Sequence, residues 1–216
     1  MPKGFFKTEP PSFEREQDLY QKHFEVVIGL DEVGRGALAG PVVACSVFLG
    51  VSSHIYRDIL IRDSKQLSPG ARERSCNALL DQLSSVGDFS VGCATEKEID
   101  DYGIAPATRM AMVRAVEGMH VQPDAMLIDA VRLSELPIYQ EAIIRGDQLS
   151  LSIAAASIIA KVTRDRLMID METEYPGYGF AGNKGYGSGE HMRALRNLGP
   201  SSFHRRSFQP TRGMLT

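Results

Sequence analysis

Two adjacent carboxylates close an apolar run near the start of this chain, and a glycine-rich turn follows them at once. The segment reads Gly29-Leu30-Asp31-Glu32-Val33-Gly34-Arg35-Gly36. Placing Asp31 and Glu32 against a core costs free energy unless something positive compensates them. Glycines let a phosphate come close to the backbone. The segment therefore indicates a fold that holds a metal ion and a phosphate at one place.

The overall charge sets up no strong field for a polyanionic partner. The 216 residues carry a net charge of −3 and a pI near 6.0, so nucleic acid would have to be held locally. Residues 184–216 contain six Lys and Arg against a single Glu, a local net charge of +5. This basic end is either a substrate-binding part or a solvated tail.

Length and composition predict one large domain with a full core. A polar, proline-containing leader is expected at residues 1–24, before the main domain at residues 25–216. The three cysteines are far apart and form no C-x-x-C pair, which argues against a disulfide framework or a zinc site. No signal-peptide pattern and no stretch of roughly 18 apolar residues is present. We therefore expect a cytoplasmic monomer without membrane contact.

The apolar pattern predicts a mixed α/β sheet with helices on its faces. Strands are expected at 26–30 and 41–49, paired as an antiparallel hairpin across the glycine-rich turn, and at 88–94, 125–128 and 141–145. Helices are expected at 12–23, from Ser68 through Leu83, at 104–120 and at 149–172.

Four carboxylates share one kind of position, at or just after the end of a strand: Asp31, Glu32, Asp129 and Asp147. Ligands bind at the carboxyl ends of strands in α/β sheets, so separate segments can bring these groups together. Oxygen-only ligands favour Mg²⁺ or Mn²⁺ over zinc. A pair of divalent ions would relieve the repulsion among four carboxylates and could activate water for attack on a phosphodiester.

Each carboxylate also has a purely structural interpretation. Asp147 could cap the helix that follows it, and Asp129 could be an ordinary turn residue. Adjacent Asp31 and Glu32 point to opposite faces of a regular strand, so both can face one site only if the strand breaks there. The glycines that follow make such a break feasible, but spacing alone favours the structural interpretation.

Three segments contain groups suited to a sugar and its phosphate. The turn Gly34-Arg35-Gly36 has backbone freedom and charge, and residues 63–68 offer a hydroxyl and an ammonium ahead of a helix. Residues 177–188 mix aromatic residues with glycines and Lys184, which suits stacking beside a phosphate. Taken singly these signals are weak, because glycine turns are common in hairpins and the other two segments could equally be surface or packed loops.

Taken together, these segments resemble ribonuclease HII, the type 2 ribonuclease H family, from about residue 26 to residue 208. The resemblance is carried, after residues 29–36, by Asp63-Ser64-Lys65-Gln66-Leu67-Ser68, Leu127-Ile128-Asp129, Gly146-Asp147, residues 152–165, Gly185-Tyr186-Gly187 and His204-Arg205-Arg206-Ser207-Phe208. Their joint order and spacing make chance a poor explanation.

The resemblance implies a ribonuclease H-like fold with a helical C-terminal extension. It implies an endoribonuclease that hydrolyses the RNA strand of RNA/DNA hybrids and cuts 5′ of single ribonucleotides embedded in duplex DNA. Two divalent ions, Mg²⁺ or Mn²⁺, would act during catalysis and leave 3′-OH and 5′-phosphate ends. By motif, the catalytic, metal-binding carboxylates would be Asp31, Glu32, Asp129 and Asp147. Asp165, on the long helix, would match a family acid that lies near the metal site.

The resemblance also implies nucleic-acid contacts. The turn Gly34-Arg35-Gly36 matches the family segment that reads the ribose 2′-hydroxyl, largely through backbone atoms, and this hydroxyl is what distinguishes RNA from DNA. Tyr186 matches the tyrosine that stacks beneath the deoxyribose following the ribonucleotide. Lys65 and Lys184 would bind phosphates.

The chain departs from the usual family pattern at three places. Asn183 stands where a histidine is common, Ala105-Pro106 interrupts a segment usually written without proline, and Arg145 precedes Gly146 where lysine is frequent. No proposed ligand is affected, so the departures bear on the grip on substrate and not on chemistry.

Three other interpretations are weaker. Ribonuclease HIII normally carries an additional N-terminal substrate-binding domain, for which about 25 residues before the first motif are too few. A non-catalytic nucleic-acid-binding module leaves four carboxylates near phosphate unexplained, because without metal they would repel it. A phosphatase of small molecules gives no reason for Tyr186 together with the basic end. A sliding-clamp contact through the short tail, residues 209–216, stays open, although no motif for one is recognisable there.

Overall fold

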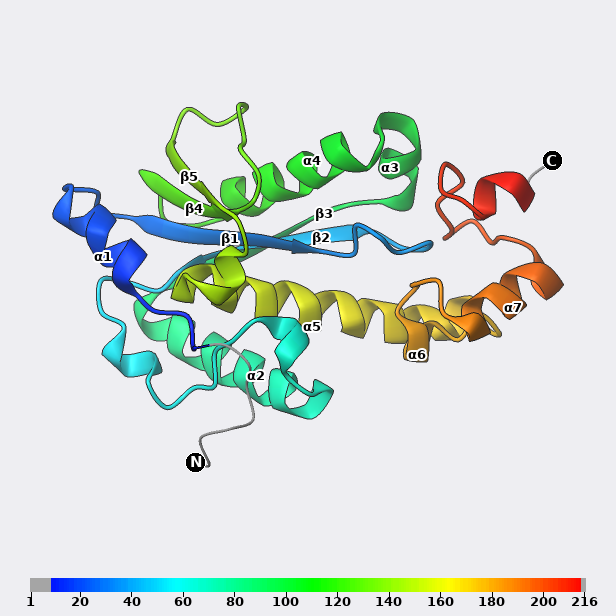
Figure 1. Ribbon diagram of the computed structural model, residues 1–216, viewed down its shortest axis with the longest axis horizontal. Coiled ribbons are helices and arrows are strands. Elements are labelled where there is room, and N and C mark those ends of the chain that lie inside the picture. Colours follow the sequence, from blue (N-terminus) through cyan, green and yellow to red (C-terminus); the bar gives the residue numbers. More distant parts are fainter. Residues whose placement is uncertain (1–8, 215–216) are drawn as a thin grey trace.

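The computed structural model describes residues 9–214, and a five-stranded mixed sheet lies at its centre (Figure 1). Its strands are β1 (Val27–Val33), β2 (Val42–Phe48), β3 (Asp88–Ala94), β4 (Ala125–Asp129) and β5 (Tyr139–Ile143), in the spatial order β3-β2-β1-β4-β5. The β1–β2 and β2–β3 pairs are antiparallel, and the β1–β4 and β4–β5 pairs are parallel. The predicted mixed sheet and the hairpin across the glycine-rich turn are confirmed.

Helices cover both faces of this sheet. They are α1 (Glu14–Gln21), α2 (Pro69–Val86), α3 (Glu96–Tyr102), α4 (Ile104–Glu117), α5 (Leu151–Glu174), α6 (Phe180–Asn183) and α7 (Gly189–Leu198), with short 3₁₀ helices η1 (His54–Tyr56), η2 (Ser64–Gln66), η3 (Gly146–Gln148) and η4 (Thr211–Met214). In Figure 1, α3 and α4 lie on one face, α5 and α2 on the other, and α6 and α7 beyond one end of the sheet. Across residues 9–214, no helix is both long and apolar enough to cross a membrane.

Alternation along β1 divides its side chains between two apolar layers. Ile28 and Leu30 belong to the layer that α4 covers, whereas Val27 packs with Ile153 of α5. Gly29 lies directly under α5, because a Cβ placed there would come within 2.2 Å of the Ser152 carbonyl carbon. The missing side chain lets the long helix approach the central strand closely, and this closeness positions the end of β1 against α5.

Local signals explain most of the element boundaries. Ser68 caps α2 by accepting the Ala71 N–H at 3.3 Å, with Pro69 in the first turn. Pro106 falls in the first turn of α4, where the missing N–H costs no helical hydrogen bond. The expected strand at 141–145 is observed as β5, two residues earlier, and α1 is shorter than the expected 12–23 helix. The helices α3, α6 and α7 were not predicted individually.

Candidate active site

Asp31 and Asp129 come together because β1 and β4 are parallel neighbours. Leu30 pairs with Ile128 in the register of the two strands, so the next residues along, Asp31 and Asp129, lie at the same edge of the sheet. Asp31 is only 5% exposed. Burial raises its pKa well above the usual value, and the charges of Glu32 and Asp129 raise it further. These two strand ends therefore build a concentrated negative charge.

The strand does not break at the adjacent carboxylates, contrary to the expectation from the following glycines. β1 continues to Val33, with Asp31 paired to Cys45 and Glu32 to Ala44. The regular backbone sends Asp31 toward α5 and Glu32 toward the opposite face. Both still lie near Asp129, whose charge acts on each of them. The end of the neighbouring strand, not a break in β1, connects the pair electrostatically.

Glu32 keeps one oxygen free for a ligand. Its Oε1 lies 3.3 Å from Arg35 Nη1, while its Oε2 is buried and accepts no hydrogen bond from any described residue. Burial raises the pKa of Glu32 against the lowering effect of Arg35. A buried, unused acceptor is costly, and a cation at this oxygen would remove the cost.

Asp147 reaches the same edge from η3, between β5 and α5. It is 4% exposed, and burial together with the charge of Asp63 raises its pKa to about 6. Asp129 Oδ1 accepts the Gly146 N–H at 2.8 Å, which fixes this turn beside β4. The cap of α5 is Ser150, whose Oγ accepts the Ile153 N–H. The alternative interpretation of Asp147 as the helix cap is therefore wrong.

Lys65 supplies positive charge to this acidic edge. Its Nζ lies 3.6 Å from Asp147 Oδ2. Burial lowers the pKa of Lys65, but the charges of Asp147, Asp63, Asp31 and Asp129 outweigh burial and raise it. Asp63 is a further buried carboxylate near this edge, and it accepts the Lys65 backbone N–H at 2.9 Å and a Gln148 side-chain N–H at 3.2 Å. Asp63 is the N-cap of η2, and no signal in the sequence indicated its nearness to Asp147.

The donor set suits a hard divalent cation. Within the described part of the chain, no three or more acidic, His or Cys side chains are arranged as a ready ligand shell. The carboxylates are linked pairwise instead, by the β1–β4 register, the Asp129–Gly146 hydrogen bond and Lys65. All donors are oxygens, one is buried and unused, and the pKa values of Asp31, Glu32 and Asp147 are raised. This chemistry fits Mg²⁺ or Mn²⁺.

The Gly34-Arg35-Gly36 turn adjoins the carboxylates and is joined to the Tyr186 segment. Gly34 has a φ of +95°, and a Cβ there would come within 2.2 Å of Arg164 Nε, so both conformation and space require glycine. The Leu38 N–H donates to the Gly185 carbonyl at 2.8 Å. The two segments that the sequence assigns to the nucleic acid are therefore held side by side.

Tyr186 lies between cationic side chains and a buried histidine pair. The Arg164 Cζ and Lys161 Nζ are 5.4 Å and 5.9 Å from its ring centroid. Its carbonyl is 2.9 Å from His191 Nδ1, and His191 Nε2 lies 3.0 Å from His204 Nε2. Because His191 Nδ1 must donate to that carbonyl, the neutral pair is ordered, with His204 donating to His191.

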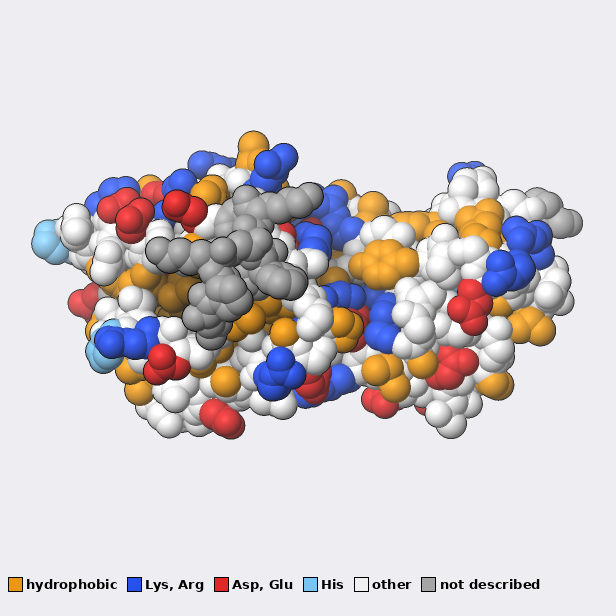
Figure 2. All heavy atoms as spheres, turned by 60° about the horizontal axis from the view of Figure 1, so that its bottom comes forward, with side chains coloured by type: hydrophobic (Ala, Val, Ile, Leu, Met, Phe, Trp, Pro, Cys, Tyr) orange, Lys and Arg blue, Asp and Glu red, His pale blue; other side chains and the backbone are white. Residues whose placement is uncertain are grey.

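Asp165 and Lys184 do not join the four carboxylates directly. Asp165 is held on α5 between Lys161, at 2.5 Å, and Arg72, at 3.5 Å. Lys184 donates to the Ala181 carbonyl. Together with these side chains it lines a hollow between α2, α5 and α6. In Figure 2, Lys and Arg side chains gather where the molecule narrows, between the larger body that carries the sheet and the smaller C-terminal part.

The basic C-terminal end is only partly a charged surface. Arg193, Arg196, Arg206 and Arg212 are exposed, whereas Arg205 is completely buried. Asn183, the departure from the family pattern, ties its loop together by donating to the Tyr178 carbonyl and accepting the Gly185 N–H, both at 2.8 Å. The interpretation of the whole end as a solvated tail is therefore wrong.

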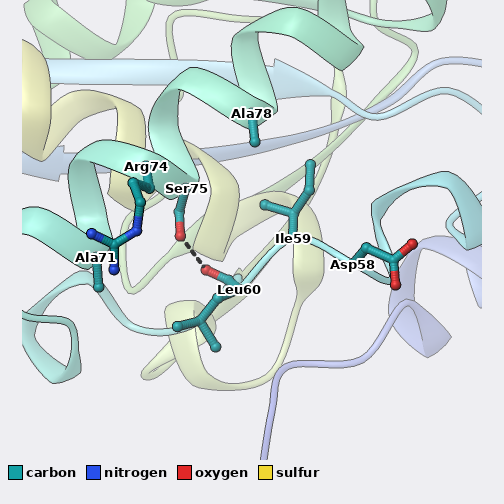
Figure 3. Close-up of a pocket in the computed structure, with 7 residues that line it drawn as sticks. All are labelled: Asp58, Ile59, Leu60, Ala71, Arg74, Ser75 and Ala78. Atoms are coloured by element: carbon teal, nitrogen blue, oxygen red, sulfur yellow. Dashed lines mark hydrogen bonds between the residues drawn. The ribbon is translucent and has the colours of Figure 1, made fainter.

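A separate hollow lies beside the first half of α2, where Ser75 Oγ donates to the Leu60 carbonyl at 2.7 Å (Figure 3). None of the four candidate carboxylates lines it. Its wall combines Asp58 and Arg74 with aliphatic side chains, and it offers no group of the acidic site. We therefore place the candidate active site at the edge of the sheet, where β1, β4 and η3 meet.

Solved structures with the same fold include nucleases. The chain aligns with the ribonuclease H2 of Pyrococcus horikoshii OT3 at a TM-score of 0.72 and 28% identity, covering 87% of this chain and 96% of that one. It also aligns with the ribonuclease HII of Archaeoglobus fulgidus, solved in a complex with PCNA, at a TM-score of 0.68 and 21% identity, covering 85% and 95%. The fold and the acidic edge define a hydrolytic nuclease of the ribonuclease H class.

Sequence comparison gives the family. The model described as Ribonuclease HII matches residues 28–211. The ribonuclease HII of Chloroflexus aurantiacus is 49% identical over 202 residues, 93% of this chain and 94% of that protein, and that of Dehalococcoides mccartyi strain BAV1 is 46% identical over 206 residues, 95% of each. The chain belongs to the ribonuclease HII family. It is therefore an endoribonuclease that acts on RNA/DNA hybrids.

Proposed function

We propose that this enzyme cuts RNA/DNA hybrids and also incises duplex DNA on the 5′ side of single embedded ribonucleotides, leaving 3′-OH and 5′-phosphate ends. One observation carries the proposal: the Gly34-Arg35-Gly36 turn lies one residue after Asp31 and Glu32, and the Leu38 N–H just beyond the turn donates to the Gly185 carbonyl beside Tyr186. A sugar bound at the turn would have its phosphate at the carboxylates and the next sugar toward Tyr186. That order matches a junction between RNA and DNA.

We propose Asp31, Glu32, Asp129 and Asp147 as the residues that hold two divalent ions, Mg²⁺ or Mn²⁺. When bound, such ions supply an activated water and stabilise the charge on the leaving 3′-oxygen. A related fold, the ribonuclease HIII from Bst, has been solved with Mn²⁺. Lys65, beside Asp147, would neutralise the acidic edge before the ions arrive and attract a phosphate afterwards.

Each nucleic-acid contact has a distinct chemical role. The Arg35 and Gly36 N–H groups, which donate to no other described residue, would bind the ribose hydroxyl and an adjacent phosphate. The Tyr186 ring would pack against the following deoxyribose, and Lys184 and Lys161 would hold phosphates further along. Asp165 would keep Lys161 and Arg72 in place through its two ion pairs. Two further assignments stay predictions, a monomeric cytoplasmic enzyme and the division at residue 25.

The deciding experiment uses a DNA duplex that contains one ribonucleotide, end-labelled on the strand that carries it. With Mg²⁺ or Mn²⁺ we expect a single cut 5′ of the ribonucleotide and a 3′-OH on the upstream fragment. Chelation with EDTA should abolish cleavage. A cut on the 3′ side, or cleavage that survives chelation, would contradict the proposal, while an all-DNA duplex serves as the uncut control.

A further inference from the structure

Two arginine side chains are completely buried beneath the Gly34-Arg35-Gly36 turn. Arg164 comes from α5 and Arg205 from the segment after α7, and both are 0% exposed. Buried cations are normally paired with carboxylates. Within residues 9–214, neither guanidinium has a carboxylate oxygen within 4.0 Å. The fold therefore retains two buried charges that lack the usual compensation.

Backbone carbonyls take the place of a carboxylate. Arg205 donates to the carbonyls of Gly34, Arg35 and Gly40 at 2.7, 2.9 and 2.9 Å. Arg164 donates to three more, those of Ala39, Pro41 and Lys184, at 3.1, 2.9 and 2.9 Å. Five of the six acceptors lie within residues 34–41, and the sixth lies in the segment that leads to Tyr186. The two rigid guanidinium forks thus fix the path of the whole turn.

This arrangement prepares the turn for an anion. The inward carbonyls are used, while the Arg35 and Gly36 N–H groups bond to no other described residue. Burial, and then the nearby Arg164, lower the pKa of Arg205 to about 9, so it stays charged at pH 7. Two charges behind a polar backbone, in a region with little water, attract a phosphate more strongly than exposed arginines do.

We propose that Arg164 and Arg205 are positioning residues for ribonucleotide recognition, which hold the Gly34-Arg35-Gly36 turn in its receptive form and set the positive field beneath it. The inference rests on the proposed function, since that turn is proposed to read the ribose. Neither arginine touches the substrate. Their contribution is to selectivity, and it requires the planar fork as well as the charge.

The test compares Arg205→Lys with wild type. Lysine keeps the charge but cannot donate to three carbonyls in the fork geometry. We measure kcat and KM on the duplex with one ribonucleotide, and the inhibition constant of the matching all-DNA duplex. We expect KM to rise so that discrimination, the inhibition constant divided by KM, falls about tenfold, roughly the effect of one charge-assisted hydrogen bond. A folded Arg205→Lys protein with wild-type discrimination would overturn the inference.

Arg206→Lys is the matched control, because it makes the same exchange of guanidinium for ammonium one residue away at an exposed position. It should leave discrimination unchanged. Equal loss of discrimination in both variants would show that the effect does not depend on the buried guanidinium of Arg205 and would overturn the positioning role. The wild-type enzyme tests the proposed function separately. If it shows no preference for the duplex with one ribonucleotide over the all-DNA duplex, the proposed function is contradicted before any variant is compared.

A measurement on the unaltered enzyme covers the case in which Arg205→Lys does not fold. The completely buried Arg164 and Arg205 predict two slowly exchanging Nε–H resonances in a ¹⁵N NMR spectrum, beside that of Arg72, whose Nε–H donates to the Ser64 carbonyl away from the turn. Without divalent metal, both should shift when the duplex with one ribonucleotide is added and much less with the all-DNA duplex. Equal shifts with both duplexes, or no protected resonances, would contradict the inference.

Discussion

A buried carboxylate with a raised pKa weakens the fold at neutral pH, because the folded state binds the proton more tightly than the unfolded state. The pKa of Asp147 is about 6 in the fold against 3.8 in its absence. The destabilisation caused by Asp147 is therefore complete above pH 6, where it amounts to about 3 kcal/mol at most, and it is relieved as the pH falls from 6 to 3.8. Asp31 and Glu32 act in the same direction. The site is costly until a cation compensates it.

Removing one of these charges should separate activity from stability. Asp31→Asn is expected to abolish cleavage but spare binding of the RNA-containing duplex. Without divalent metal it should raise the free energy of unfolding by about 1 to 3 kcal/mol at pH 7, because a repelled, buried charge is gone. Gel-based cleavage, a binding titration and urea denaturation test these outcomes. Asp170→Asn, on the exposed side of α5, is the control, and comparable turnover by the Asp31 variant would refute the role.

The buried histidine pair predicts a dependence of the opposite sign. Burial, and then the neighbouring His191, lower the pKa of His204 to about 4. Its contribution to stability is complete above pH 6.5 and is lost as the pH falls toward 4, by about 3 kcal/mol. The stability difference between wild type and His204→Gln should shrink over that range in urea titrations. A difference that stays constant with pH would contradict this account.

Residue types and their positions along the chain predicted part of the candidate site. Their positions at strand ends drew attention to Asp31, Glu32 and Asp129, although spacing alone favoured a structural interpretation, and the β1–β4 register then brings two of them together. Arg164 and Arg205 lay within the matching segments but were given no role, because arginine is normally exposed. Only tertiary structure shows that six carbonyls surround them.

Among the elements, α5 organises the site, and its first turn is held by the N-terminal helix. Glu16 of α1 is completely buried, and its Oε1 accepts from the Ser150 hydroxyl at 2.6 Å and from the Ser152 N–H and hydroxyl at 2.9 and 2.6 Å. A carboxylate also suits the positive end of the helix dipole. The segment before β1 therefore takes part in placing α5 against the sheet.

Glu16→Ala should expose how much this contact contributes. It leaves three buried donors unpaired and opens a cavity, so we expect a loss of about 2 to 4 kcal/mol in the free energy of unfolding. Urea denaturation measures it. Glu14→Ala, at an exposed position of the same helix, should change stability by less than about 0.5 kcal/mol. Similar values for the two variants would show that Glu16 does not anchor α5.

Strong periodicity made the long elements predictable, and short ones escaped for physical reasons. The runs that became β1, β2, β4 and α5 are apolar and bounded by turn residues. The seven-residue α3 has only a short local signal, the capping box of Thr95 and Glu98 that the structure shows. The four-residue α6 exists because tertiary contacts hold it, since so short a helix is not stable by itself.

At the scale of the molecule, the proposed recognition depends on two segments about 150 residues apart in sequence. The Gly34-Arg35-Gly36 turn and the Tyr186 loop are linked by the Leu38–Gly185 hydrogen bond and by Arg164. Net charge gives no general attraction to nucleic acid, so the proposed recognition requires the local cluster of Lys and Arg side chains and a fit of shape. On this proposal, a junction between RNA and DNA is the substrate feature that would use both segments.

Tyr186→Ala tests this division of labour. The variant should lose about tenfold or more in kcat/KM on the single-ribonucleotide duplex, since one stacking contact contributes roughly 1 to 3 kcal/mol. A uniform RNA/DNA hybrid, in which no junction has to be read, should lose less. Tyr186→Phe keeps the ring and is the control. Equal losses on both substrates would argue against junction reading.

The buried position of Arg205 has a consequence for how the enzyme comes into being. Its three carbonyl partners lie more than 160 residues earlier in the chain, and contacts of such separation form late, after a long loop has closed. During synthesis on the ribosome, the acidic edge of the sheet is translated before the arginine that we propose holds the Gly34-Arg35-Gly36 turn. A nascent chain would therefore contain its candidate catalytic carboxylates before it could select a substrate in the proposed way, and the proposed selectivity would be complete only once Arg205 has been translated.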